Sequence, residues 1–574
     1  METLLSYLQS GATGTLSFVL LLGVLIFVHE LGHFLVARWC GIRVETFSLG
    51  FGKKILQMKR GHTTYCVSLI PLGGYVKMFG EQPFSGDMVG EGENQRPMTA
   101  EEKNQSFTHK NVWQRIAVVM AGPLMNFFFA VLIFTLVALI GENTKGPLLG
   151  DVASPSLAEQ QGFKSGDLLL KVEDSDINTW EDFQKQLNKK IHTNEADSQI
   201  AVLVQREGLS HPLEIKAVVS RRPNTNPISS EKFVGDIDGL NPYSRSSHVG
   251  VPANSPMTLL GMKTGDRIAS INDMKVTHFR ELDPLLKKVD PKQPLNLEIE
   301  RLANDEKKTE KISIQWSPQE KIKEYSLATL KLETTDLYLG RILKKTPADS
   351  AGLKPWDKII SIDTKAVTKW DDVLNAIKSY SGTQPMSIEV MRGVEKKMFE
   401  ITPQMTSQML PTGAEDKRYT IGINALLMYS DIDFVRVKAK GMGAAIARAF
   451  TRSVDMSVMT LNVFKKLIFG EISHKNIGGV ISIAQAAHDS FISGLSSFLL
   501  MMGFISINLF VLNLLPVPVL DGGHMVFYII ELLKGSPLSL KKMEMAQQVG
   551  MVLLMSLMVF ALFNDVSRVF FTSQ

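Results

Sequence analysis

Two histidines and a glutamate lie inside one of the most apolar stretches of the chain. His29 and His33 are four positions apart, so a helix would place both imidazoles on one face. Two imidazoles at this spacing can hold one Zn²⁺ ion, and Glu30 between them can act on a zinc-bound water. A chance match to this short pattern is the alternative, but ionisable groups inside an apolar segment are costly and indicate a functional site.

A distant carboxylate would complete this metal site. Asp521 is the one acidic residue in the apolar stretch 498–523, where Pro516 and Pro518 would unwind a helix and let the carboxylate turn inward. A catalytic zinc site commonly has three protein ligands and a water molecule. We therefore expect Asp521 to be the third ligand beside the two histidines.

Three further polar residues accompany this carboxylate. Asn508 and Asn513 carry amide donors that can hold a substrate backbone or a developing oxyanion, although hydrogen bonding between helices explains them equally well. His524 follows Asp521 by three positions. We expect it to support the ligands from outside or to be structural, because a fourth protein ligand would leave no room for the water.

Size and composition restrict the class of protein. The chain has 574 residues, too many for one domain, and a formal net charge of only +4, which gives no reason to expect a nucleic-acid partner. The two cysteines, Cys40 and Cys66, imply no disulfide framework.

Four apolar blocks are long enough to span a bilayer, which needs about 20 mostly apolar residues. With their flanks, we assign them to residues 1–40, 113–141, 492–524 and 546–568. The first lacks a basic leader and a cleavage site, so it is a permanent span rather than a signal peptide. Basic residues gather in 38–115 and 534–542, which predicts that these loops are cytoplasmic and that region 141–437 and both termini lie outside.

Two segments beside the spans have recognisable patterns. Residues 41–112 predict a cytoplasmic β-hairpin and connector, and the glycines of this hairpin include Gly50, Gly52, Gly73 and Gly74. Its edge could pair with an extended substrate backbone, or it could simply face solvent. Residues 436–475 predict an amphipathic helix on the outer membrane surface, with an ordinary core helix as the alternative.

The region between the second and third spans contains an internal repeat. A short helix, a glycine turn, an aspartate and an apolar strand recur three times about every 90 residues, at Gly162, Gly261 and Gly352. The pattern is similar to PDZ domains, which we place at 146–225, 235–320 and 333–425. Such domains bind peptide termini at a sheet edge, but a purely steric role would need no ligand.

These motifs together resemble the intramembrane site-2 proteases, in particular their bacterial RseP type. The matching residues are HELGH at 29–33, GFG at 50–52, PLGGYVKM at 71–78, AGPLMN at 121–126, NLLPVPVLDGGH at 513–524 and ALFNDVSR at 561–568. The chain departs from that group in two ways. Val480 stands where the group has proline in its Gly-Pro-Ile-Ser-Ile-Ala stretch, and there are three PDZ-like copies where two are usual.

The resemblance implies a polytopic α-helical membrane protein with four transmembrane helices, a membrane-associated β-hairpin and tandem extracytoplasmic α+β PDZ domains. It implies that His29, His33 and Asp521 bind Zn²⁺ and that Glu30 is the catalytic base. It also implies a bacterial inner-membrane enzyme that cleaves single-pass proteins, such as an anti-sigma factor in envelope-stress signalling or remnant signal peptides. A membrane-anchored PDZ scaffold with an inactive metal site, and a metal-ion carrier, are the alternatives.

Overall fold

The chain divides into two compact units in the computed structural model. One unit joins Met1–Asn143 to Arg436–Gln574, and the other is Thr144–Val435. The structure describes residues 2–571 apart from 82–87, 90–95, 194–197, 227–228, 230, 303–308, 319–320, 383, 410–414, 431–433 and 473–476. The end of the predicted surface helix, 473–475, therefore lies outside the described residues.

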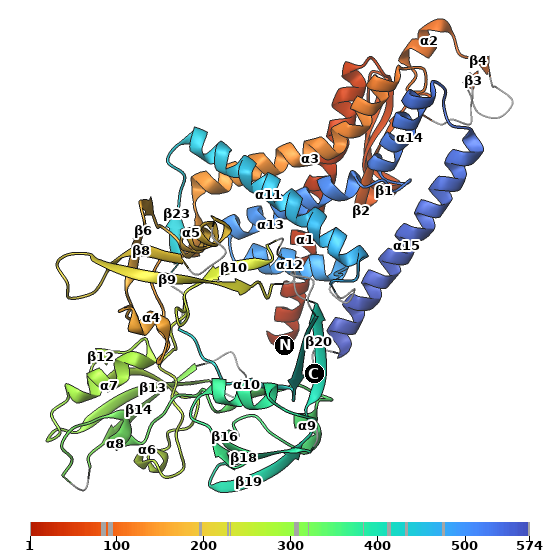
Figure 1. Ribbon diagram of the computed structural model, residues 1–574. Helices are drawn as coiled ribbons and strands as arrows, with labels where there is room; N and C mark the ends of the chain where they lie inside the picture. Colours follow the sequence, from red (N-terminus) through yellow and green to blue (C-terminus); the bar gives the residue numbers. More distant parts are fainter. Residues whose placement is uncertain are drawn as a thin grey trace. The chain divides into compact units, whose positions relative to one another are not determined.

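The first unit is mostly helical (Figure 1). Its elements are α1 (Glu2–Trp39), β1 (Val44–Arg60), β2 (Thr63–Met78), β3 (Met88–Val89), β4 (Arg96–Pro97), α2 (Ala100–Gln105), α3 (Val112–Ile140), α11 (Met442–Ile468), α12 (Val480–Ile492), α13 (Leu495–Asn513), α14 (Asp521–Lys534) and α15 (Leu540–Phe571). Strands β5 (Glu142–Lys145) and β23 (Phe434–Val437) lie where the chain passes between the units.

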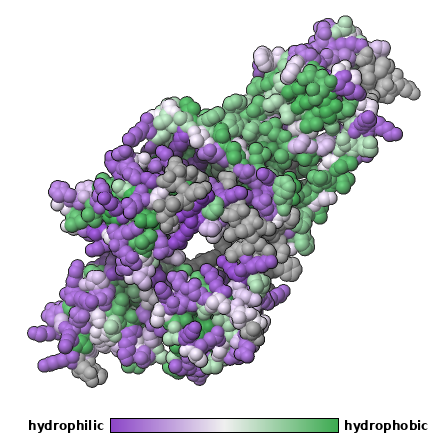
Figure 2. Space-filling model, viewed as in Figure 1, coloured by the Kyte–Doolittle hydropathy of each residue, from purple (hydrophilic) through white to green (hydrophobic). Residues whose placement is uncertain are grey.

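Four helices among the described residues are long and apolar enough to cross a membrane, as the sequence predicts. The spans are Thr13–Trp39, Val112–Ile140, Leu495–Asn513 and Lys541–Ser567. Large apolar side chains on them stay exposed, including Phe128, Leu132 and Val552, and apolar surface gathers over the helical unit in Figure 2. An exposed apolar belt of this extent is what a lipid-facing surface requires.

Helices α1, α3 and α13 pack through a shared apolar core. One cluster of fully buried side chains joins Leu21 and Leu25 of α1 to Ile133 of α3 and Met502 of α13. The third predicted span does not run on to residue 524. Helix α13 ends at Asn513, and the chain starts a new helix, α14, at Asp521, since the intervening prolines cannot continue the hydrogen-bond ladder.

The predicted hairpin folds over on itself and makes a small sheet. Residues 46–49 of β1 pair both with 64–67 and with 74–77 of β2, while the end of β1 pairs with 63–68. The four segments therefore lie in the order 74–78, 44–49, 64–67 and 54–60, and no further strand among the described residues pairs with either outer segment. Gly50 and Gly52 have positive φ angles of 86° and 85° at the bend in β1, a backbone conformation that favours glycine.

Helix α11 packs with a face of small residues. Ala445, Ala449, Ser453, Ser457 and Thr460 are its buried residues, and the larger apolar side chains at Met442, Ile446, Phe450, Val454, Val458 and Leu461 are exposed. The Ser453 and Ser457 hydroxyls donate to carbonyls of their own helix. Small side chains whose hydroxyls bond within their own helix let neighbouring helices approach closely. The larger apolar side chains of α11 therefore face lipid or solvent.

The second unit contains three successive α/β folds with separate cores. The first has α4 (Leu157–Gln160), β6 (Leu168–Val172), β7 (Ser175–Asp176), α5 (Trp180–Thr193), β8 (Ser198–Gln205), β9 (Leu213–Pro223) and β10 (Phe233–Asp236). The second has α6 (Pro256–Leu259), β11 (Arg267–Ile271), β12 (Met274–Lys275), α7 (Phe279–Lys287), β13 (Leu295–Leu302), β14 (Thr309–Trp316) and α8 (Leu327–Leu330). The third has β15 (Leu339–Ile342), α9 (Pro347–Ala351), β16 (Lys358–Ile362), β17 (Lys365–Ala366), α10 (Trp370–Lys378), β18 (Met386–Arg392), β19 (Glu395–Ile401), β20 (Gln404–Met409), β21 (Glu415–Thr420) and β22 (Ile423–Ala425).

The repeated aspartate has the same structural role in each fold. Asp167, Asp266 and Asp357 are almost fully buried, and each pairs with an arginine at 2.6–2.7 Å: Arg206, Arg301 and Arg392. The same arginines donate to the carbonyls of the three repeated glycines. These aspartates are thus structural. The residue just before each aspartate has a positive φ angle: 89° at Gly166, 91° at Gly265 and 73° at Trp356, which takes the place of glycine in the third copy.

Candidate metal centre

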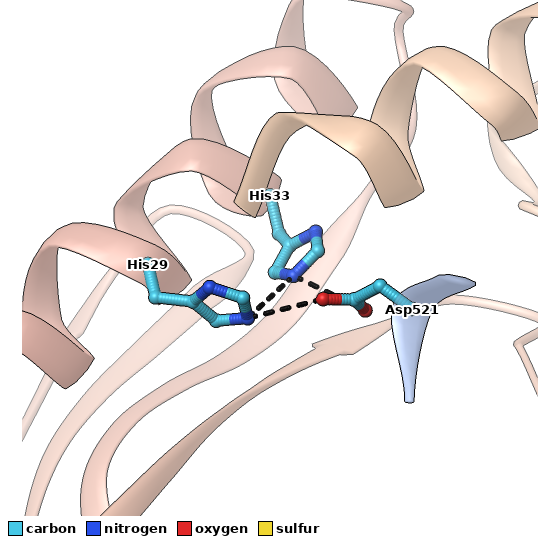
Figure 3. Close-up of side chains that lie close together, drawn as sticks. All are labelled: His29, His33 and Asp521. Atoms are coloured by element: carbon cyan, nitrogen blue, oxygen red, sulfur yellow. Dashed lines mark hydrogen bonds and ion pairs between the residues drawn. The ribbon is translucent and has the colours of Figure 1, made fainter. Parts of the chain in front are cut away.

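Helix α1 presents His29 and His33 on one face, as their spacing predicts. Their Nε2 atoms are 3.2 Å apart (Figure 3). An Asp521 carboxylate oxygen lies 3.2 Å from Nε2 of His29, and the other oxygen lies 3.6 Å from Nε2 of His33. The three side chains converge from residues nearly 500 positions apart in sequence.

These distances fit a zinc ion. Ligand atoms bound to zinc at about 2.0–2.2 Å in a tetrahedral arrangement are roughly 3.3 Å from one another. The three observed separations lie close to that value, and one ligand atom from each of the three residues falls within 4.8 Å of the others. The donor set of two imidazoles and one carboxylate is also that of known catalytic zinc sites, which keep the fourth position for water.

Helix α14 brings Asp521 to the histidines because its first turn is tightly packed. Asp521 is the first residue of this helix, where the helix dipole favours a carboxylate. A Cβ atom on Gly522 would lie 2.3 Å from the Leu514 carbonyl oxygen, and one on Gly523 would lie 2.2 Å from that of Val517. Only glycine fits at both positions. The Asp-Gly-Gly sequence therefore packs the start of α14 against the segment that connects it to α13.

A hydrogen bond orients His33 for metal binding. Its Nδ1 atom lies 2.8 Å from the Val118 carbonyl oxygen of α3. A carbonyl only accepts hydrogen bonds, so Nδ1 carries the proton and Nε2 presents its lone pair toward Asp521. The tautomer that a metal ligand needs is therefore set by the backbone of α3.

Asn126 provides the corresponding contact to His29. Its side-chain nitrogen lies 3.3 Å from His29 Nδ1, while its side-chain oxygen is buried without a partner among the described residues. The two ends of an amide are interchangeable by a half-turn. In the turned amide the side-chain oxygen accepts a hydrogen bond from Nδ1–H of His29, so it gains a partner and Nε2 of His29 is left free for a metal. The buried amide therefore fits the tautomer of His29 that metal binding requires.

Two glycines let α3 approach the histidines. A Cβ atom on Gly122 would lie 2.2 Å from Nε2 of His33, and one on Gly32 would lie 2.3 Å from the Ala121 carbonyl oxygen. Neither position has room for a larger residue. The close packing of α1 on α3 is what brings Val118 and Asn126 within hydrogen-bond reach of the imidazoles.

Glu30 lies next to one edge of the small sheet. A Cβ atom on Gly74 would be 2.9 Å from Glu30 Cγ and 2.9 Å from the Ser48 carbonyl oxygen. Glycine at this position therefore allows strand β2 to pass directly beside the glutamate. The neighbouring Gly73 lies against the Phe51 ring and has a φ of 156°.

Three other residues singled out in the sequence, Asn508, Asn513 and His524, do not belong to the group of candidate metal ligands. Asn508 accepts a hydrogen bond of 2.9 Å from the Thr460 hydroxyl of α11, which is the helix-to-helix contact that the sequence left open. Asn513 is the last residue of α13 and is half-buried. His524 lies edge-to-face with Phe527 and does not belong to the group of three metal-binding candidates.

The supporting residues on α3 are less evident from the sequence, where Gly122 and Asn126 stand only within the AGPLMN match at 121–126. The signal in the sequence is an amide side chain inside an apolar span. Asn126 is fully buried in the structure, and a buried amide needs a polar partner. The identity of that partner, His29, depends on packing between helices that are 97 residues apart at this contact.

A pair of helical histidines with an intervening glutamate, completed by a remote carboxylate, defines a metallopeptidase site. The model of Peptidase family M50 matches residues 17–557. The chain belongs to this family and is a zinc metalloprotease.

Its relatives match over nearly their whole length. The chain is 31% identical over 554 residues to the protein called Protease RseP of Yersinia pestis, and 30% identical over 553 residues to the Regulator of sigma E protease of Salmonella typhi. It is 28% identical over 554 residues to the Regulator of sigma-E protease RseP of Escherichia coli K12. Each match covers 96% of this chain and 98% of the relative.

Proposed function

We propose that this protein is an intramembrane endopeptidase whose zinc ion is held by His29, His33 and Asp521. The convergence of these three side chains at 3.2–3.6 Å carries the proposal. Bound zinc would supply Lewis-acid chemistry, polarising the scissile carbonyl and acidifying a water. His29 and His33 lie on the apolar span Thr13–Trp39, so the peptide bond that reaches this site lies within or near the bilayer.

Glu30 is the general base in this proposal. It follows His29 directly on α1 and interacts electrostatically with all three candidate ligands without being one of them. From there it takes a proton from the attacking water and can return that proton to the departing amine. Val118 and Asn126 keep the imidazoles in the orientation and tautomer that metal binding requires.

The sheet edge next to Glu30 is the proposed substrate-binding strand. A transmembrane helix hides its carbonyls in its own hydrogen bonds, so it must unwind before hydrolysis. The outer edge of residues 74–77 pairs with no strand among the described residues, so it can pair with the unwound backbone, and Gly73 and Gly74 let it pass close to the glutamate. Gly50 and Gly52 shape the bend of the adjoining segment, and Asn513, together with Asn508, would steady the substrate.

The three folds of the second unit are proposed to be PDZ domains at 146–225, 235–320 and 333–425. Each has the same order of short helix, strand, long helix and hairpin, which supports the assignment. We propose that they admit substrates already trimmed on the outer side, either by steric exclusion or by binding a peptide terminus.

Names of the relatives support a substrate class. Two are called regulators of sigma E, so we propose that this enzyme cleaves a single-pass anti-sigma factor, and remnant signal peptides as well. We place it in the bacterial inner membrane, with the PDZ domains and both termini outside and the active site toward the cytoplasm. The basic loops 38–115 and 534–542 support this orientation.

Cleavage of a truncated single-span substrate in liposomes tests the proposal. We expect cleavage by the wild type, loss of cleavage on chelation, and recovery when zinc is added back. The Glu30→Gln variant should bind zinc but not cleave, since it keeps the ligands and lacks the base. Cleavage that survives Glu30→Gln would refute the mechanism.

A further inference from the structure

A buried ion pair joins α14 to α3 at the end of α14 opposite Asp521. Arg115 donates to both carboxylate oxygens of Glu531, at 3.1 and 2.6 Å, and the two side chains are only 11% and 15% exposed. The same guanidinium donates to the Lys110 carbonyl oxygen and lies over the Tyr528 ring, 4.9 Å from its centre. Arg115 is therefore held in one orientation by several contacts.

The pair lies on the same face of α14 as the proposed metal ligand. Asp521, His524, Tyr528 and Glu531 follow one another at helical spacings of three or four residues. Fixing Glu531 thus fixes the rotation of the whole helix. A shift of one residue would turn Asp521 by about 100° away from the histidines.

Helix α3 connects the two halves of the metal site. Asn126 and Gly122 of this helix contact His29 and His33, and Arg115, at the start of the same helix, holds α14. The two imidazoles and α14 therefore both contact the same helix, which links the position of Asp521 to that of the histidines. Packing at Gly522 and Gly523 holds the near end of α14, but this packing alone does not fix the direction of the helix axis.

We propose that Arg115 and Glu531 are positioning residues that set the metal affinity of the site by holding Asp521 against His29 and His33. The inference rests on the proposed metal-binding role of these three side chains. Neither residue belongs to the group of three candidate ligands. The effect of the pair is to orient a ligand from outside the coordination shell, and we take as its scale the 10- to 100-fold weakening that follows loss of a partner hydrogen-bonded to a metal ligand.

A second buried ion pair in the same unit provides a matched control. Glu142, just beyond the end of α3, accepts from Arg448 and Arg452 of α11 at 2.6 and 2.7 Å, and its side chain is 11% exposed. The Glu142 carboxylate is buried like that of Glu531, whereas its two arginine partners are 39% and 35% exposed, and none of the three residues lies on α14. A general loss of stability would affect both pairs, whereas positioning of Asp521 concerns only one.

The test measures zinc affinity of the full-length purified protein by competition with a chromogenic chelator. Glu531→Gln and Arg115→Ala should weaken zinc binding 10- to 100-fold, while Glu142→Gln should stay within twofold of the wild type. Arg115→Lys keeps the charge but not the bidentate contact, so its zinc affinity should lie between those of the wild type and Arg115→Ala. At saturating zinc, the KM of Glu531→Gln for a model substrate should be unchanged, because the pair does not touch substrate.

Two outcomes would overturn the inference. Zinc affinity of Glu531→Gln within twofold of the wild type would show that the pair only stabilises the fold. Equal weakening in Glu142→Gln would show a general effect of losing a buried charge. These results differ from failure of the proposed function, in which the wild type itself would bind no zinc at the three ligands and cleave nothing.

Discussion

The Asp565 carboxylate near the end of α15 accepts a hydrogen bond of 2.9 Å from the backbone N–H of Ile481 at the start of α12. It also accepts from the N–H groups of Gly479 and Ser482 and from the Ser482 hydroxyl. This buried carboxylate therefore caps α12 from another helix. It links segment 479–484 to segment 561–568, which the sequence shows only as separate matches to the related enzymes.

These contacts predict that Val480 tolerates proline, the residue that the related enzymes have there. Asp565 accepts from the residues on either side of Val480 but not from Val480 itself among the described contacts. Proline is also favoured at the first position of a helix. Val480→Pro should change the free energy of unfolding by less than about 1 kcal/mol. Ile481→Pro removes a used donor and should cost about 1–3 kcal/mol. Thermal denaturation in detergent compares the two, and equal losses would contradict the capping role.

The Asn126 contact predicts a loss of metal affinity without a loss of fold. Asn126→Ala removes the group that orients His29, so zinc binding should weaken roughly 10- to 100-fold. The measurement is zinc retained after dialysis against a graded series of chelator. Thr135→Val is a control on the same helix, because the one described contact of the Thr135 hydroxyl is its hydrogen bond to the Val131 carbonyl oxygen of its own helix. Unchanged zinc retention in Asn126→Ala would contradict the role of the amide.

The approach of Gly74 to Glu30 predicts a catalytic defect from a single methyl group. In Gly74→Ala the new Cβ would lie 2.9 Å from Glu30 Cγ, so the glutamate or the strand must move. A displacement of about 1 Å can cost 100-fold in rate. We expect kcat to fall 10- to 100-fold while zinc content stays unchanged. Gly23→Ala on α1, where nothing lies within 4 Å of the new atom, should cleave as the wild type does.

His248 in the second α/β fold predicts a pH-dependent stability of the second unit. Burial, together with the nearby Arg267 guanidinium, lowers the pKa of His248 to about 4 from 6.5. The unfolded chain takes up a proton first as the pH falls, so the free energy of unfolding should decrease from pH 6.5 toward pH 4. Pulse proteolysis in urea at several pH values measures this. His248→Gln should flatten the dependence, and an identical slope in the variant would exclude His248 as its source.

Residues that carry chemistry were more predictable than the contacts that support them. The spacing of His29 and His33 places them on one face of any helix, and Asp521 is conspicuous because no other acidic side chain shares its apolar surroundings. The four candidate spans likewise follow from length and hydropathy. These features depend on local sequence alone.

Contacts between distant segments could not be read in the same way. The sequence places Asn508 near the site, but only packing of α11 on α13 pairs it with Thr460. The fold of the hairpin into four strand segments depends on which parts of β1 and β2 meet, which alternation of side chains does not specify. Helix α14 was missed because its turn from α13 is stabilised by Gly522 and Gly523 against distant carbonyls.

Zinc K-edge X-ray absorption of the purified protein tests the central claim most directly. We predict one zinc ion per chain, with two nitrogen ligands at about 2.0–2.1 Å and oxygen ligands at about 2.0–2.2 Å. Asp521→Asn should alter the oxygen shell, and His33→Ala should remove a nitrogen ligand or the ion itself. A protein without zinc, or a spectrum unchanged by both substitutions, would contradict the assignment of His29, His33 and Asp521 as the metal site.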